Sequence, residues 1–152
     1  MVADISQGNV DAMAKRYGAT PVDPSQIHAQ EVDIFAPCAL GGVINDDTLL
    51  EIRAEIVCGL ANNQLAEPRH GAALQAAGIT YVPDYVVNGG GIMAAGALIY
   101  SEPSDEESTQ RVMGLFETVT QILEQADTES RPTSDIADDI ARARIANGQH
   151  DR

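Results

Sequence analysis

Short apolar runs alternate with segments of helical spacing through most of this 152-residue chain. Apolar and β-branched residues predict strands that are each followed by a helical or polar segment, at residues 2–5, 32–36, 55–58 and 79–82. A brief edge strand is expected at 20–22, where Pro21 is acceptable because an edge residue need not donate a hydrogen bond. Because strands and helices alternate with short connections, the sequence predicts an α/β fold with a doubly wound, Rossmann-like parallel sheet.

Helices are predicted between and after these strands from apolar spacing and capping residues. Gly18 and Gly78 suit the C-terminal ends of two helices, and the oxygen-bearing side chains of residues 45–48 suit the start of a third. In the tail, apolar residues recur at helical spacing over 112–123, and Pro132 suits the opening of a last helix. The expected helices span residues 7–17, 24–27, 48–53, 67–77, 105–126 and 132–146.

Composition and charge exclude several classes of protein. Hydrophobic residues make up 44% and charged residues 21% of the chain, as in a folded globular protein. A formal net charge of −14 argues against nucleic acid or an anionic membrane as a partner, since both attract basic surfaces. No apolar run approaches the ~20 residues that cross a bilayer, and the first residues lack the core of a signal peptide.

Cysteine and histidine are sparse. Cys38 and Cys58 are the only cysteines, and the three histidines are scattered. Because neither a CxxC pair nor histidine at ligand spacing is present, the sequence predicts no metal site and no disulfide scaffold. We therefore expect a protein of the reducing cytoplasm.

Small or amide-bearing residues follow the predicted strands, at the edge where open parallel sheets bind ligands. Asp4 suits either the hydroxyls of a ribose or the cap of a helix. The turn at 37–42 favours either a close backbone approach or a tight strand-to-helix connection. Three adjacent amides at 62–64 suit a carboxamide, a carboxylate or a ribose, or else form a polar loop. Asn88, which precedes three glycines, fits an amide presented to a ligand or a flexible corner.

Three motifs in this order carry a resemblance to a known family. They are Pro37-Cys38-Ala39-Leu40-Gly41-Gly42, Gly59-Leu60-Ala61-Asn62-Asn63-Gln64-Leu65 and Pro83-Asp84-Tyr85-Val86-Val87-Asn88-Gly89-Gly90. Together with the acidic strand end at Asp4, they make the chain resemble the glutamate/leucine/phenylalanine/valine dehydrogenases, and in particular the leucine and phenylalanine type. The resemblance runs from residue 2 to about 146.

The resemblance implies an oxidoreductase that uses NAD. Such an enzyme oxidatively deaminates an L-amino acid of the leucine, valine or phenylalanine class to a 2-oxo acid. By position in the motifs, the residues expected to bind NAD are Asp4, Ile5, Cys38, Ala39, Leu60, Asn62 and Asn88. The residues expected to contact the substrate are Asn62, Ile92 and Ala95. Met93 stands where the family commonly carries a second asparagine, so the local hydrogen bonding is expected to differ.

Parts of the family's site are expected outside this chain. The glycine-rich loop that seats the pyrophosphate would precede Asp4 by about 20 residues, and the family's catalytic lysines and aspartate belong to its other domain. Lys15, the only lysine here, lies in the helix after the first strand, on the wrong side for the chemistry. We therefore expect no catalytic residue in the chain. We also expect a sheet without its first strand, which would leave two unpaired edges across a gap.

The resemblance also predicts how the chain is divided. Residues 1–100 are expected to form a partial dinucleotide-binding, Rossmann-like domain, residues 101–146 C-terminal helices that pack on it, and residues 147–152 a frayed tail. The chain is thus expected to be an N-terminally truncated cofactor-binding part, inactive alone, of an enzyme whose full-length form is a homo-oligomer. The alternative is a non-catalytic stand-alone module or gene relic that complements or regulates a separately encoded half.

Overall fold

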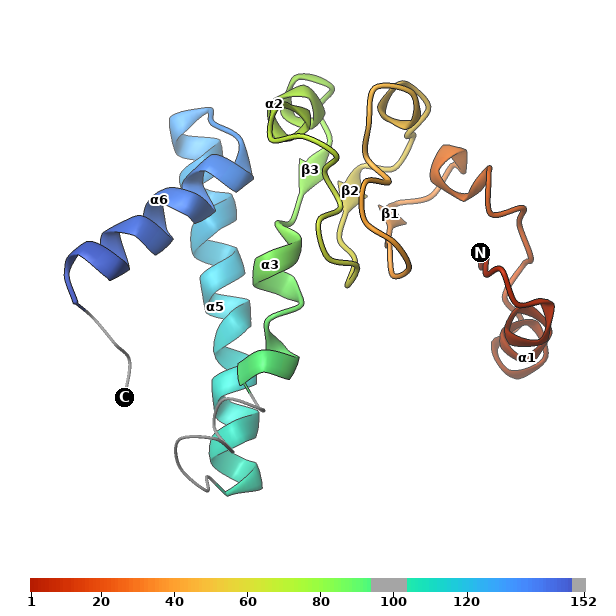
Figure 1. The fold of residues 1–152 in the computed structure, drawn as a ribbon, viewed down its shortest axis with the longest axis horizontal. Coiled ribbons are helices and arrows are strands. Elements are labelled where there is room, and N and C mark those ends of the chain that lie inside the picture. The colour runs from red at the N-terminus through yellow and green to blue at the C-terminus, as the bar shows by residue number, and fades with distance from the viewer. Residues whose placement is uncertain (94–103, 149–152) are drawn as a thin grey trace.

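The computed structural model describes residues 1–93 and 104–148, which run from a helix near the N-terminus through a central sheet to paired C-terminal helices (Figure 1). The elements in chain order, with η marking a 3₁₀-helix, are α1 (Gln7–Tyr17), η1 (Ile27–Ala29), β1 (Ile34–Phe35), η2 (Thr48–Leu50), β2 (Ile56–Val57), α2 (Arg69–Ala76), β3 (Thr80–Tyr81), α3 (Asp84–Val87), α5 (Asp105–Glu129) and α6 (Thr133–Ala146). No helix in the described ranges is long and apolar enough to cross a membrane.

The central sheet contains β1, β2 and β3 side by side, and both neighbouring pairs are parallel. Ile34 pairs with Ile56, and Ile56 pairs with Thr80. The predicted α/β fold with a parallel, Rossmann-like sheet is therefore confirmed. The strands are shorter than predicted, because the ladder ends where Pro37 follows β1 and where glycine or proline soon follows the other two strands.

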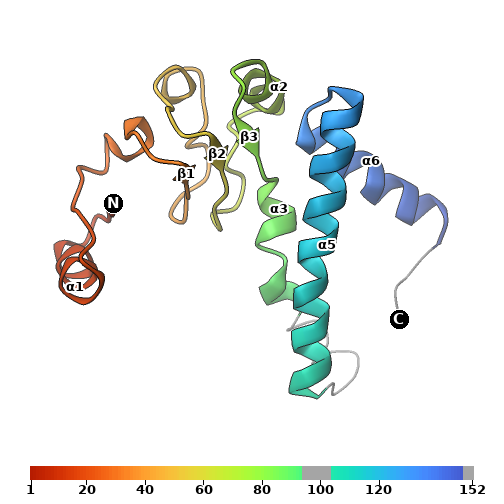
Figure 2. The same ribbon diagram turned by 180° about the vertical axis from the view of Figure 1, so that it is seen from behind.

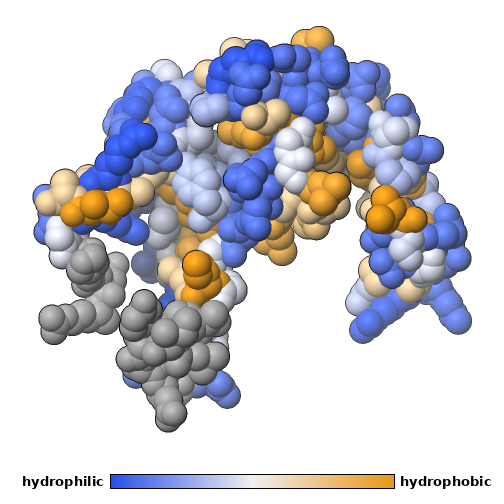
Figure 3. Space-filling view, viewed as in Figure 1, coloured by the Kyte–Doolittle hydropathy of each residue, from blue (hydrophilic) through white to orange (hydrophobic). Residues whose placement is uncertain are grey.

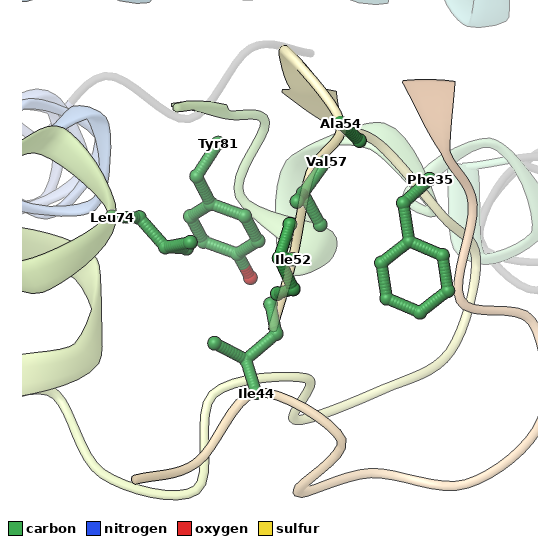
Figure 4. Packing of buried hydrophobic residues seen from close by; sticks show 7 residues of the cluster. All are labelled: Phe35, Ile44, Ile52, Ala54, Val57, Leu74 and Tyr81. Atoms are coloured by element: carbon green, nitrogen blue, oxygen red, sulfur yellow. The ribbon is translucent and has the colours of Figure 1, made fainter. Parts of the chain in front are cut away.

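One face of the sheet is buried. Phe35, Val57 and Tyr81 are buried and point to the same side, as residues of adjacent strands in register must. They pack with apolar residues from the segments between the strands, namely Ile44, Ile52, Ala54 and Leu74 (Figure 4). This cluster fixes the sheet, and with it the loops that leave its carboxyl edge.

A second core holds the C-terminal helices together. Ile122 and Ala126 of α5 pack against Ile136 and Ala137 of α6, with Val86 of α3 at the border. The α5 helix begins in a capping box between Ser104 and Glu107. At the start of α6, the Thr133 hydroxyl donates to the Tyr81 carbonyl at 2.6 Å, which anchors that helix to the end of β3.

The N-terminal segment lies beyond the open edge of β1, at the end of the molecule opposite α5 and α6 (Figures 1 and 2). Its extended part is limited to a parallel bridge between Val2 and Pro21. The Val2 N–H donates to Thr20, and the Val22 N–H donates back to Val2, each at 2.9 Å. Within the described ranges, no strand pairs with the outer edge of β1.

The helix predictions are correct for the longer elements and wrong for two short ones. The helix expected at 24–27 is a turn that leads into η1, which spans Ile27–Ala29. Helix α1 ends at Gly18, whose φ of 66° is the left-handed conformation predicted for its C-cap. The segment predicted as a helix through Arg53 forms only η2, although Asn45 Oδ1 does accept the backbone N–H groups of Asp47 and Thr48 as a capping residue should. Ile52, which lies two residues after the end of η2, is buried in the core of the sheet.

Candidate functional site

A cavity of about 850 Å³ opens at the carboxyl edge of the sheet. Its walls come from the connection after β2, from β3 and the residues that follow it, and from the start of α6. The hydrophobic surface in Figure 3 gathers under the arch that the molecule forms in this view. Leu60 and Ile92 contribute exposed apolar surface to the cavity, with exposed fractions of 61% and 76%. This volume is in the range of sites for small molecules and cofactors.

Two amide side chains meet in this cavity. Asn88 Nδ2 donates to Asn62 Oδ1 at 2.6 Å and approaches the Leu60 carbonyl at 3.4 Å. Within the described residues, Asn62 Nδ2 has no acceptor and Asn88 Oδ1 has no donor. The pair therefore offers one donor and one acceptor, which is the complement of a primary carboxamide.

Asp84 holds the amide loop in place from beneath. The side chain is buried, accepts the Asn63 N–H at 2.7 Å and accepts the Tyr81 hydroxyl at 2.6 Å. Asn63 has a φ of 54°, a conformation that asparagine tolerates better than most residues. Burial, and then the bond to Asp84, raise the pKa of Tyr81, so that its hydroxyl remains a donor at neutral pH.

Gln64 has a structural role, unlike the two asparagines before it. Its side chain is fully buried, and Nε2 donates to the carbonyls of Gly59 and Ala61 at 2.7 and 3.0 Å. The three adjacent amides are thus divided, with Asn62 and Asn63 exposed and Gln64 closing the loop from inside. The interpretation of all three as ligand groups is wrong for Gln64.

The glycine turn after β1 packs closely on the loop after β2. A Cβ built on Gly41 would lie 2.6 Å from the Asn62 carbonyl oxygen and 2.8 Å from that of Asn63. The Gly42 N–H donates to the same Asn63 carbonyl at 2.7 Å. The close backbone approach predicted for this turn is therefore present, and its partner is the neighbouring loop.

Helix α6 supplies the wall that the sequence analysis missed. Tyr85 donates its hydroxyl to Asp138 at 2.9 Å and approaches the Ser134 carbonyl at 3.2 Å. Partial burial, and then the bond to Asp138, raise the pKa of Tyr85. The sequence placed Tyr85 inside a motif, but no local pattern pairs it with a helix about 50 residues later. With Glu67, Asp84 and Asp135 also in the lining, the cavity wall is acidic.

The predicted site residues fall into two groups. The cavity described above is lined by four of them, Leu60, Asn62, Asn88 and Ile92. Asp4, Ile5, Cys38 and Ala39 do not line it. Ala95 lies outside the described residues.

At the N-terminus, Asp4 and Ile5 lie just before α1. Asp4 accepts the Ser6 N–H at 2.7 Å and Asn9 Nδ2 at 3.1 Å, and these bonds, with Ser6 first, lower the pKa of its carboxyl. Ile5 is fully exposed. These two bonds show that Asp4 helps to organise the start of α1, which is the second role predicted for it. About half of the acceptor sites of its carboxylate remain available for other donors.

Comparison with known proteins agrees with the three motifs. The family model for glutamate/leucine/phenylalanine/valine dehydrogenases matches residues 2–151. The chain belongs to this family. Leucine dehydrogenase of Bacillus subtilis is 38% identical to this chain over all 152 residues. Phenylalanine dehydrogenase of Thermoactinomyces intermedius is 38% identical to it over 146 residues.

A solved structure supports the family's fold for this chain. The crystal structure of L-tryptophan dehydrogenase from Nostoc punctiforme matches with a TM-score of 0.88 and 37% identity, over 95% of this chain and 43% of that one. The dehydrogenase-family chain spans about two-fifths of the length of the curated relatives, since it covers 42% of the Bacillus subtilis and 40% of the Thermoactinomyces intermedius enzyme.

Proposed function

We propose that this chain is the C-terminal, NAD-binding part of an amino-acid dehydrogenase. The longer enzyme would oxidatively deaminate an L-amino acid of the leucine, valine or phenylalanine class to a 2-oxo acid in the cytoplasm, as a homo-oligomer. The proposal is supported by the family membership and by relatives named for leucine and phenylalanine. On this proposal residues 1–100 are the partial cofactor domain, and residues 101–146 are helices that close it.

The observation that carries the proposal is the amide pair of Asn62 and Asn88. The 2.6 Å bond between them fixes both side chains and leaves a donor and an acceptor pointing to one cavity. A nicotinamide ring carries a primary carboxamide, which needs this complement. Leu60 and Ile92 supply apolar surface beside it, as a flat aromatic ring requires. The residues present therefore fit the nicotinamide end of NAD.

The charge of the cavity argues for that end of the cofactor and against the pyrophosphate. Glu67, Asp135 and Asp138 line the cavity and would repel phosphate. An ammonium group, in contrast, is attracted to such a wall, and an amino-acid substrate carries one. We propose that Asn62 also reaches the substrate and that Ile92 and Ala95 face its side chain.

The rest of the cofactor would run from the cavity across the strand ends. Cys38 and Ala39, in the turn after β1, would line its path with small side chains. Asp4, a carboxylate at neutral pH, would accept ribose hydroxyls and repel a 2′-phosphate, with Ile5 beside the adenine. When bound, NAD⁺ supplies the hydride acceptor. The chain's own residues bind it, orient it and hold its carboxamide.

The groups that move protons belong, on this proposal, to the part of the enzyme that this chain does not span. Lys15 is its only lysine, lies in α1 and is not among the residues that line the cavity. We therefore expect no turnover of leucine, valine or phenylalanine by the purified chain with NAD⁺. Its affinity for NADH should be weaker than ~1 mM, which corresponds to roughly −4 kcal/mol.

Nuclear magnetic resonance tests the carboxamide site at such weak affinity. Nicotinamide, titrated into the ¹⁵N-labelled chain, should shift the side-chain amide signals of Asn62 and Asn88. Asn62→Ala should abolish the shift at Asn88. The matched control is Asn63→Gly, which removes a neighbouring amide while keeping the backbone conformation and the N–H bond to Asp84. Shifts that survive Asn62→Ala unchanged would refute the site.

A second function is favoured by the unpaired edge of β1. The chain would be a non-catalytic module that complements or regulates a separately encoded half. The two functions are distinguished by mixing the chain with the part of the Bacillus subtilis enzyme that lies outside the match, which is more than half of that enzyme. Amino-acid-dependent reduction of NAD⁺ supports the enzyme, whereas co-purification without turnover supports the module.

A further inference from the structure

Two free thiols stand at the ends of adjacent strands, outside the cavity described above. Cys58 directly follows β2, and Cys38 lies three residues beyond β1. The register that pairs Phe35 with Val57 places Ala36 opposite Cys58. Because side chains alternate along a strand, Cys58 points away from the buried face that Phe35 and Val57 share. Cys38 is exposed, and so is Ala36, which lies two residues before it. Both thiols therefore lie on the open face of the sheet.

The backbone next to both cysteines is in close contact. Gly59, directly after Cys58, packs so tightly on Pro37 that a Cβ built on it would overlap the Pro37 backbone. The Ala61 N–H also donates to the Pro37 carbonyl at 2.9 Å. Cys38 is the next residue after Pro37, so each thiol is one residue away from this contact.

The two thiols differ in environment. Cys38 is exposed, while Cys58 is half-buried. Burial, and then the neighbouring Cys38, raise the pKa of the Cys58 thiol. Cys38 makes no backbone hydrogen bond among the described residues. A disulfide needs a Cα separation of about 4.4–6.8 Å.

We propose that Cys38 and Cys58 form a two-thiol oxidation site, at which a low-molecular-weight disulfide converts the pair into an internal bridge. The exposed Cys38 thiolate attacks the disulfide RS–SR, which forms a mixed disulfide on Cys38 and releases one RSH after protonation. The Cys58 thiolate then attacks Cys38 Sγ and releases the second RSH. The two cysteines lose two protons and two electrons in all, and the small disulfide gains them as it becomes two molecules of RSH.

The bridge would join the turn after β1 to the loop after β2. That loop carries Asn62, so oxidation would fix one wall of the cavity and remove an exposed thiol from the other loop. An effect on NAD binding rests on the proposed function, whereas formation of the bridge depends only on the two strand ends. Formation of the bridge can therefore be measured even if the chain does not bind NAD.

The experiment treats the purified 152-residue chain with glutathione disulfide and follows its intact mass and a proteolytic map. The wild type should pass through a glutathione adduct on Cys38 and end as a monomer with a Cys38–Cys58 bridge. Cys58→Ser should stop at the Cys38 adduct, which should persist about tenfold longer or more, because no internal thiol resolves it. Cys38→Ser should acquire glutathione much more slowly, since the remaining thiol is half-buried.

Three results would overturn the proposal. They are a stable adduct on the wild type, a bridge between two molecules, and a bridge that forms only in urea. Circular dichroism of both serine variants shows whether they fold. If Cys58→Ser does not fold, Cys58→Ala serves the same purpose.

Discussion

Replacing Gly59 with alanine tests how the strand-end loops are built. This glycine lies directly against Pro37, and an added Cβ would overlap the Pro37 backbone oxygen and nitrogen and lie 2.6 Å from its Cδ. The atoms in the way are backbone and a proline ring, which have no rotamer to change. Either the loop after β1 or the loop after β2 must therefore move.

The expected cost follows from two opposing effects. Overpacking at a rigid site costs about 1–3 kcal/mol, and a clash with backbone belongs at the upper end of that range. Alanine also restricts the unfolded chain, which returns about 0.4–1 kcal/mol. We expect Gly59→Ala to lower the free energy of unfolding by about 2 kcal/mol, which for a chain of this length corresponds to a fall of about 4–8 °C in Tm.

Equilibrium urea unfolding, followed by circular dichroism, measures this change. The matched control is Gly114→Ala, in the interior of α5, where a built Cβ meets nothing within 4 Å. That variant should be more stable than the wild type by about 0.5–1 kcal/mol, because alanine favours a helix over glycine. Opposite signs for the two variants are expected. If Gly59→Ala is neutral or stabilising, the close packing of the two loops does not exist in solution.

The remaining predictions concern a buried hydroxyl and an exposed ion pair. Tyr81→Phe removes the hydroxyl that donates to the buried Asp84 and should lower the free energy of unfolding in urea by about 1–2 kcal/mol. Tyr85→Phe, which removes a half-exposed hydroxyl, should lower it by less than half as much. Equal losses for the two variants would contradict the burial argument. The Arg69 guanidinium beside Asp46 lowers the pKa of that carboxyl from 3.8 to about 2. Because the folded-state pKa is depressed, its stabilising contribution is present above about pH 4 and is lost as the pH falls toward 2. The difference in thermal midpoint between wild type and Asp46→Asn should therefore be constant above about pH 5 and shrink below about pH 4, and a difference that grows with acid would refute the assignment.

The sequence predicted the longer helices and the parallel sheet better than the lengths of the strands. Amphipathic spacing located α5 to within three residues at its end, because its signal is long and local. The strand runs were overestimated, since an apolar run marks burial and not pairing. Val32, for example, packs against the core without joining the ladder of β1.

For the candidate site, the motifs pointed to four residues that line one cavity, namely Leu60, Asn62, Asn88 and Ile92, and missed what supports them. Asn62 and Asn88 are 26 positions apart, yet both follow strands of one parallel sheet, so topology alone brings them together. The contact of Tyr85 with Asp138 depends on how α6 packs, and that is fixed by the second core around Ile122 and Ile136. No residue pattern near Tyr85 carries this information.

The open edge of β1 connects the fold to the proposed function. Phe35 uses its carbonyl to bind β2, through the Cys58 N–H at 3.0 Å, so the backbone groups of its neighbour Ile34 face the other edge. Val2 likewise forms its backbone hydrogen bonds with Thr20 and Val22, and not with the open edge of β1. On the proposed function, these two unpaired edges are the places where strands from the rest of the enzyme would complete the sheet.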